Sequence, residues 1–133
     1  FTAKPPTGTS YSGAEFEFYN IPNPFSLKDK VVNVSSDGGA ALPAGAYATR
    51  GTLIKYHLPA GRSGGVKFEI FNVAGEKVRE ISDGYRSGGQ VYYSEWDGRN
   101  DSGSDCASGV YFMLAYMDGR KLGGKAHKLA LVK

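Results

Sequence analysis

Glycine and proline interrupt this sequence so often that helices have almost no room to form. Glycine accounts for 19 of the 133 residues, about twice its usual share. The runs between these interruptions are seven to nine residues long, which suits a strand but falls short of the mean helix of about 11 or 12 residues. They cover residues 14–21, 52–58, 66–74, 76–83, 90–97, 110–118 and 125–133. We therefore expect a chain of short strands joined by turns.

Apolar and polar residues alternate along several of these runs. Successive side chains of a strand point to opposite faces, so each run should turn one apolar face to a core and one polar face to water. Lys55 and His57, for example, should lie on a solvent-exposed face. Half-buried strands form antiparallel sheets, and two such sheets bury each other, so we predict an all-β antiparallel sandwich. The alternating apolar sets are Phe16 and Phe18; Ile54, Tyr56 and Leu58; and Val66, Phe68 and Ile70.

The run at 110–117 differs because it is apolar on both faces. This composition predicts a central strand, and Asp118 with Gly119 gives the hairpin signal before a closing strand. Gly75 similarly ends a short loop between two alternating runs, where a left-handed backbone position favours glycine.

The length of the chain fits one domain with a real hydrophobic core. Residues 1–13 have the composition of a linker from a preceding domain, and residues 14–133 should form the sandwich. Residues 26–51 are predicted to be an extended loop insertion with one plausible strand at 30–34. A long loop of this kind is either a decoration or a binding element.

Charge and composition argue against several kinds of partner. The net charge of +3 comes from interspersed acids and bases with no dense basic cluster, so we expect no nucleic-acid partner. No apolar run reaches the 18 or so residues of a transmembrane segment. Cys106 is the only cysteine, so no internal disulfide can form. The first residues lack the regions of a signal peptide and the chain lacks an initiator Met, so we expect a processed fragment with any export signal upstream.

Several separated motifs coincide in order along the chain. They are the segments 19–25 (YNIPNPF), 52–59, 66–79, 96–100, Gly103, 107–112 and 128–133. Together they resemble the immunoglobulin-like domain family shared by the flagellar hook-capping protein FlgD and the C-terminal sorting domains of type IX secretion substrates. The resemblance implies an immunoglobulin-like sandwich of about seven or eight strands without a catalytic centre. The chain departs from the family in the longer segment between Phe25 and Thr52.

The acidic and amide residues after Trp96 allow more than one interpretation. Trp96 and Asp97 could form a ligand site, but a Trp at a strand end fills a core, and Asp97 with Gly98 makes a turn in which the carboxylate bonds backbone amides. A calcium site is the second alternative, although the spacing does not follow the EF-hand pattern. The possible calcium ligands are Asp97, Asn100, Asp101 and Asp105.

No other motif predicts catalysis, a cofactor or a metal. His57 and His127 are far apart, and neither has a partner at a zinc-like spacing. Cys106 lacks a nucleophile signature and is expected to be a buried thiol.

The nine tyrosines leave a carbohydrate interpretation open. Tyrosine is a favoured strand residue, with a ring that packs and a hydroxyl that reaches water. The same rings would bind sugars if they shared an exposed face. The five residues concerned are Tyr85, Tyr92, Tyr93, Tyr111 and Tyr116.

Three functions therefore stand as hypotheses. The first is a non-enzymatic C-terminal module of a secreted or cell-surface bacterial protein, recognised by export or attachment machinery through docking. The second is an assembly part like the hook-cap domain, and the third is an accessory carbohydrate-binding module. The residues expected to matter are structural: Asn23, Pro24 and Phe25 in the opening turn, Trp96 and Asp97 at the core and turn, Gly75, Gly98 and Gly109 at tight backbone, and Tyr111 in the 107–112 motif.

Overall fold

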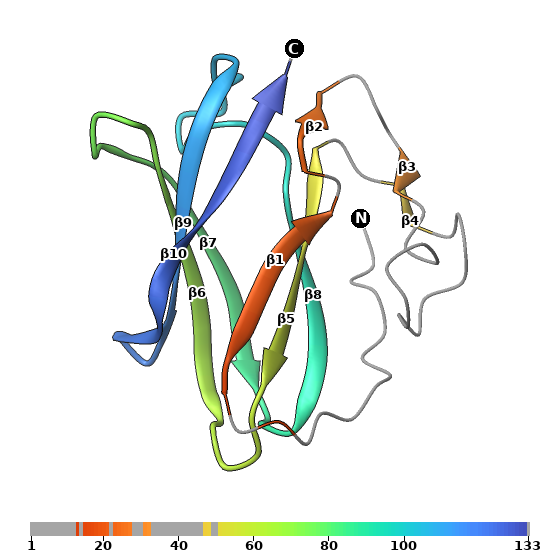
Figure 1. The fold of residues 1–133 in the computed structure, drawn as a ribbon, viewed down its shortest axis with the longest axis vertical. Helices are drawn as coiled ribbons and strands as arrows, with labels where there is room; N and C mark the ends of the chain where they lie inside the picture. The colour runs from red at the N-terminus through yellow and green to blue at the C-terminus, as the bar shows by residue number, and fades with distance from the viewer. Residues whose placement is uncertain are drawn as a thin grey trace.

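The chain forms two stacked β-sheets, shown side by side in Figure 1. The computed structural model describes residues 13, 15–21, 23–27, 31–32, 47–48 and 51–132. One sheet has three strands in the order β1-β5-β8, and the other has five in the order β2-β10-β9-β6-β7. A separate pair, β3 (Val31–Val32) with β4 (Tyr47–Ala48), lies outside both sheets.

The three-stranded sheet contains β1 (Glu17–Ile21), β5 (Thr52–Leu58) and β8 (Gln90–Trp96). The five-stranded sheet contains β2 (Phe25–Ser26), β6 (Gly64–Phe71), β7 (Lys77–Arg86), β9 (Gly109–Met117) and β10 (Arg120–Val132). All pairs are antiparallel except β2 with β10, which is parallel. The predicted all-β sandwich is confirmed, with eight strands in the two main sheets of the described chain.

Strand β6 shows why alternation is a sound guide to this fold. Val66, Phe68 and Ile70 are at most 1% exposed, while the residues between them are half-buried. The predicted central strand is also confirmed, because β9 lies between β10 and β6. The core is built from the inward residues of both sheets, including Tyr56, Phe68, Met113 and Leu129.

Two strands extend beyond the ends that their glycines predict. Strand β7 continues past Asp83 and through Gly84 to Arg86, and β10 begins at Arg120 rather than near Lys125. In both strands the glycines lie at register shifts, where a β-bulge absorbs extra residues. Glycine suits a bulge as well as a turn, so these two predicted boundaries are wrong.

The polar face expected for β5 is also wrong, because this strand is buried on both sides. Lys55 is 7% exposed and Leu53 is fully buried. The Lys55 ammonium lies 5.9 Å from the ring centroid of Tyr19 and 5.8 Å from that of Tyr93. A lysine stem covered by aromatic rings on neighbouring strands can be buried although its head is charged.

The proposed linker and loop insertion fall mainly outside the described residues. Of residues 1–13 only Gly13 is described, and residues 28–30, 33–46 and 49–50 are not. Strand β3 lies inside the strand predicted at 30–34. The role of the insertion stays a prediction. In the described part of the chain no helix is long and apolar enough to cross a membrane.

Candidate functional site

Trp96, the last residue of β8, anchors the end of the core. Its side chain is fully buried, and its Nε1 donates a hydrogen bond to the Arg99 carbonyl at 2.9 Å. Its ring makes edge contacts with Phe25 and Tyr111, each at a centroid distance of 5.5 Å. One indole therefore joins β8, β2 and β9, as expected of an aromatic ring whose N–H finds a partner.

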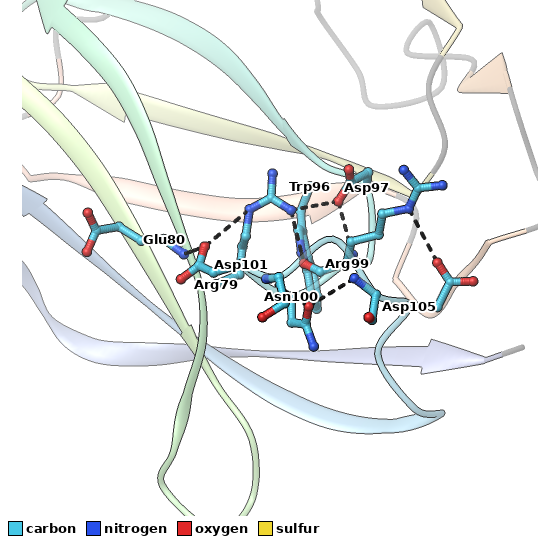
Figure 2. A network of polar contacts seen from close by, with 10 residues as sticks. Arg79, Glu80, Trp96, Asp97, Arg99, Asn100, Asp101 and Asp105 are labelled. Carbon is cyan, nitrogen blue, oxygen red and sulfur yellow. Dashed lines mark hydrogen bonds and ion pairs between the residues drawn. The ribbon is translucent and has the colours of Figure 1, made fainter.

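Asp97 organises the turn that follows. Its Oδ1 accepts a hydrogen bond from the Arg99 amide at 3.0 Å, as an Asx turn requires. The same oxygen accepts from Arg79 Nη1 at 2.9 Å, and Arg79 also donates to the Arg99 carbonyl at 3.0 Å. Figure 2 shows Arg79 reaching from β7 into this turn. The guanidinium thus ties the loop to the opposite sheet.

The remaining polar residues of the loop bond to nearby groups within the chain. Asn100 Oδ1 accepts from the Ser102 and Ser104 amides, both at 3.0 Å. Asp101 Oδ1 accepts from the Glu80 amide at 3.1 Å, and Asp105 pairs with Arg99 at 3.4 Å (Figure 2). Among the described residues no three His, Cys, Asp or Glu side chains gather to hold a metal. The calcium alternative therefore has no support from the geometry.

Gly98 has a left-handed backbone and lies against the side chain of Leu27. Its φ is +78°, and a Cβ would stand 2.2 Å from Leu27 Cδ2. Gly75 has a φ of +84° in the β6–β7 hairpin, where Asn72 Oδ1 accepts from two amides of the loop. Gly109 has a φ of 159°, at the limit of the range that residues with a Cβ rarely adopt, and a Cβ there would meet nothing within 4 Å.

The side chain of Asn23 contacts strand β10, which is distant from the opening turn in the sequence. Its Nδ2 donates to the Lys128 carbonyl at 3.1 Å, and its Oδ1 accepts from the Ala130 amide at 3.0 Å. The side-chain amide thus occupies the edge of β10 as a neighbouring strand would. The peptide bond to Pro24 is cis, and Phe25 behind it is buried at 2% exposure. The sequence offers no local sign of this contact, because the partners are more than 100 positions away.

Tyr111 closes the other end of the loop. Its hydroxyl donates to the Ala107 carbonyl at 2.6 Å. Cys106, next to that residue, is a buried thiol outside any disulfide, as expected, and its amide donates to the Gly98 carbonyl at 2.9 Å. The residues singled out around Trp96 therefore form one structural unit, with their polar groups directed at one another.

The proposed tyrosine platform does not exist as one surface. Tyr92, Tyr93 and Tyr111 are at most 6% exposed, because their positions in the strands turn them toward buried layers. Tyr85 is 70% exposed on β7, whereas Tyr116 is half-buried on β9 under Lys67. The prediction that these five tyrosines share an exposed face is wrong.

A buried polar group joins the two sheets elsewhere. Asp83 is the extra residue of the β7 bulge, since Val66 pairs with Gly84 while Lys67 pairs with Ser82. The bulge directs Asp83 inward, where it accepts from Tyr56 and pairs with Arg86 at 3.2 Å. Burial raises the pKa of Tyr56 far above its usual value, and Asp83 raises it further. Only the Asp-Gly pair within an alternating run could have suggested this bulge.

The outer face of the five-stranded sheet carries an apolar row, which we call the β9 stripe. Val110 is 36% exposed, and the next outward residues along β9 are half-buried. Val132 at the end of β10 is 53% exposed nearby. The stripe consists of Val110, Phe112, Leu114, Tyr116 and Val132. Contiguous apolar surface of this kind marks interaction sites in soluble proteins.

The two sides of the β9 stripe differ in charge. Toward β6 and β7, Lys67 pairs with Glu69 at 3.2 Å and Lys77 with Glu80 at 3.0 Å. The pKa of Lys77 is raised and that of Glu80 lowered mainly by their mutual hydrogen bond. Strand β10, on the other side, has basic residues and no acid. The stripe is therefore bordered by a neutral network on one side and positive charge on the other.

The sequence matches the model of the FlgD Ig-like domain over residues 52–119, just over half of the chain. The chain belongs to this family. The family resemblance seen in the motifs is thereby confirmed, and most of the core, the Trp96 turn and β9 lie within the matched residues. No curated protein matches the sequence.

One solved structure gives the same fold at low identity. Dimeric latent PorU from Porphyromonas gingivalis is similar to 88% of this chain with a TM-score of 0.58 and 15% identity. The similar region is 9% of that much longer chain. FlgD from P. aeruginosa aligns over 90% of this chain and 78% of its own, with a TM-score of 0.47 and 19% identity.

Proposed function

We propose that this FlgD Ig-like domain is a non-enzymatic docking module of an exported bacterial protein, which binds export or surface-attachment machinery through the β9 stripe. The observation that carries the proposal is that a central strand turns an apolar row to the solvent side of its sheet. A strand needs only one apolar face to hold a sandwich together, so the second apolar face of β9 is available to bind a partner.

Two further points support docking over catalysis. The polar residues near Trp96 bond to one another and to backbone, so they serve the fold. The motifs resemble sorting domains, which an export machine recognises as folded units. An apolar centre with a charged border is the usual anatomy of a protein interface.

Deleting the last strand would be a poor test, because Leu129 and Leu131 are each 1% exposed and belong to the core. Substitutions of exposed residues test the proposal without disturbing the core. The variant Val110→Lys with Val132→Lys places two charges on the stripe at exposed positions. We expect export of a reporter fusion to fall at least about tenfold in a host with type IX secretion, since losing about 1.4 kcal/mol of binding has that effect.

The matched control is Val73→Lys at the β6–β7 hairpin, where the valine is 75% exposed and outside the stripe. Thermal unfolding should show that all variants fold. Normal export of the folded double variant would contradict the proposal. A change in self-association alone would instead favour the assembly role.

A further inference from the structure

A second surface lies at the edges of the two sheets, where the start of β1 faces β10. Phe16 and Phe18 form one wall, and residues 123–127 form the other. The open groove between them measures about 460 Å³ and continues toward Arg62 and Lys121. We call it the β1–β10 groove.

The shape of the groove follows from the bulge in β10. Leu122 pairs with Ala115 and His127 with Met113, so residues 123–126 face Leu114 alone. Two of these four residues are glycines, so they bring no side chain to the aromatic wall. A Cβ at Gly123 would stand 3.7 Å from Phe16, while at Gly124 it would meet nothing within 4 Å. The bulge therefore brings main chain, rather than side chains, up to the rings.

Both walls are also edges of sheets. Strand β1 ends the three-stranded sheet, and β10 pairs with β2 only at Leu131 and Val132. In the described ranges no strand pairs with the outer side of β1, and between Arg120 and His127 strand β10 pairs with β9 alone, so its other side has no partner strand. Such edges offer donors and acceptors to another extended chain.

The wall of the groove is aromatic. The rings of Phe16 and Phe18 have centroids 5.3 Å apart, and Phe18 lies 5.7 Å from His127. His127 is held in place because its Nε2 contacts Asn20 Oδ1 at 2.6 Å. Burial lowers the pKa of the His127 imidazole. Both phenylalanines remain partly exposed, so an apolar side chain could cover them.

The groove also collects unpaired positive charge. Lysines and arginines of β6, of β7 and of the Trp96 loop (residues 97–106) each pair with a carboxylate. In contrast, none of the ion pairs between described residues includes Arg62, Lys121 or Lys125, all of them exposed. The rim acid Glu17 is paired with His57 at 3.5 Å, and Glu15 also has a contact of its own.

We propose that the β1–β10 groove binds an extended acidic peptide segment of another protein. An apolar side chain of the segment would cover Phe16 and Phe18, and its carboxylates would lie beside Arg62, Lys121 and Lys125. Strand edges match a peptide main chain rather than a phosphate backbone, and three cations are fewer than the six to ten phosphate contacts typical of tight DNA binding. The groove lining contains no residue of the β9 stripe, so either proposal can fail alone.

The test uses a fluorescein-labelled six-residue peptide in which glutamate alternates with phenylalanine, titrated with the whole chain and followed by anisotropy. Binding should weaken about threefold for Lys125→Gln and about tenfold for Lys121→Gln with Lys125→Gln, the size expected of exposed charge pairs. Lys128→Gln is the control, because it removes the same charge from the same strand at a residue that does not line the groove. Chemical shifts should change at Phe16, Phe18 and residues 121–127.

Three results would each overturn the inference. The peptide could fail to bind at millimolar concentration, Lys128→Gln could weaken binding as much as Lys125→Gln, or a peptide with lysine in place of glutamate could bind equally well. Tighter binding of a single-stranded oligonucleotide of equal charge would assign the groove to nucleic acid instead. The variants Val110→Lys and Val132→Lys should leave peptide binding unchanged, which separates this site from the β9 stripe.

Discussion

The Trp96 loop, residues 97–106, and the bulge of β10, residues 123–126, both interrupt the sheets with glycines and charged or polar residues, yet they are built differently. In the loop, Asp97, Asn100 and Asp101 all bond to N–H groups of the same chain. In the bulge, Lys125 is exposed beside an open aromatic groove. A polar segment that satisfies its own groups belongs to the fold, whereas one that leaves charges unpaired is available to a partner.

The largest effect should come from the anchor of the loop. Trp96→Ala removes a fully buried indole and its hydrogen bond, which should lower the free energy of unfolding by about 3–5 kcal/mol. Urea unfolding followed by tyrosine fluorescence or circular dichroism would measure it. A loss below about 1 kcal/mol would mean that the loop does not depend on this anchor.

The next largest difference between the two segments should appear when their glycines are substituted. Gly98→Ala introduces a Cβ against Leu27 at a left-handed φ and should cost about 1–3 kcal/mol. Gly124→Ala in the bulge meets open space and should change stability by less than about 0.5 kcal/mol. Equal effects at the two sites, measured by thermal unfolding, would remove the distinction between them.

Asp97→Ala tests the polar network of the loop. Removing the carboxylate leaves the Arg99 amide without its acceptor and takes one of its acceptors from Arg79, so we expect a loss of about 1–2 kcal/mol. A double-mutant cycle with Arg79→Ala should give a coupling of about 0.5–1 kcal/mol, because both side chains are partly exposed. Zero coupling would show that Arg79 does not hold the loop.

The smallest stability effect is expected at the bulge. Lys125→Gln removes no ion pair within the described residues and should leave the free energy of unfolding unchanged within about 0.5 kcal/mol. Urea unfolding at low and high salt would check this. A loss above about 1 kcal/mol would show that the bulge, like the loop, is bound internally.

The sequence predicts those parts of the fold whose partners are close along the chain or repeat regularly. Alternation locates β6 and its core residues because each strand position follows from its neighbours. The turn at Asp97 is predictable because the carboxylate and the Arg99 amide are two positions apart. The central position of β9 follows from its composition, which is apolar on both faces.

Features that depend on distant partners are not predictable in this way. Gly84 and Gly123 permit either a turn or a bulge, and the partner strand decides which one forms. Asp83 is directed inward by such a bulge toward Tyr56 on the other sheet. The burial of Lys55 depends on tyrosines from two neighbouring strands, and the β1–β10 groove depends on residues more than 100 positions apart.

The contact of Asn23 with β10 has a consequence for how copies of this domain behave at high concentration. A single amide takes the hydrogen-bonding groups of Lys128 and Ala130 that a second molecule would need in order to add a strand. Sheet growth from molecule to molecule would first have to dislodge that amide. One side chain thereby protects this part of β10 from acting as a template for fibres.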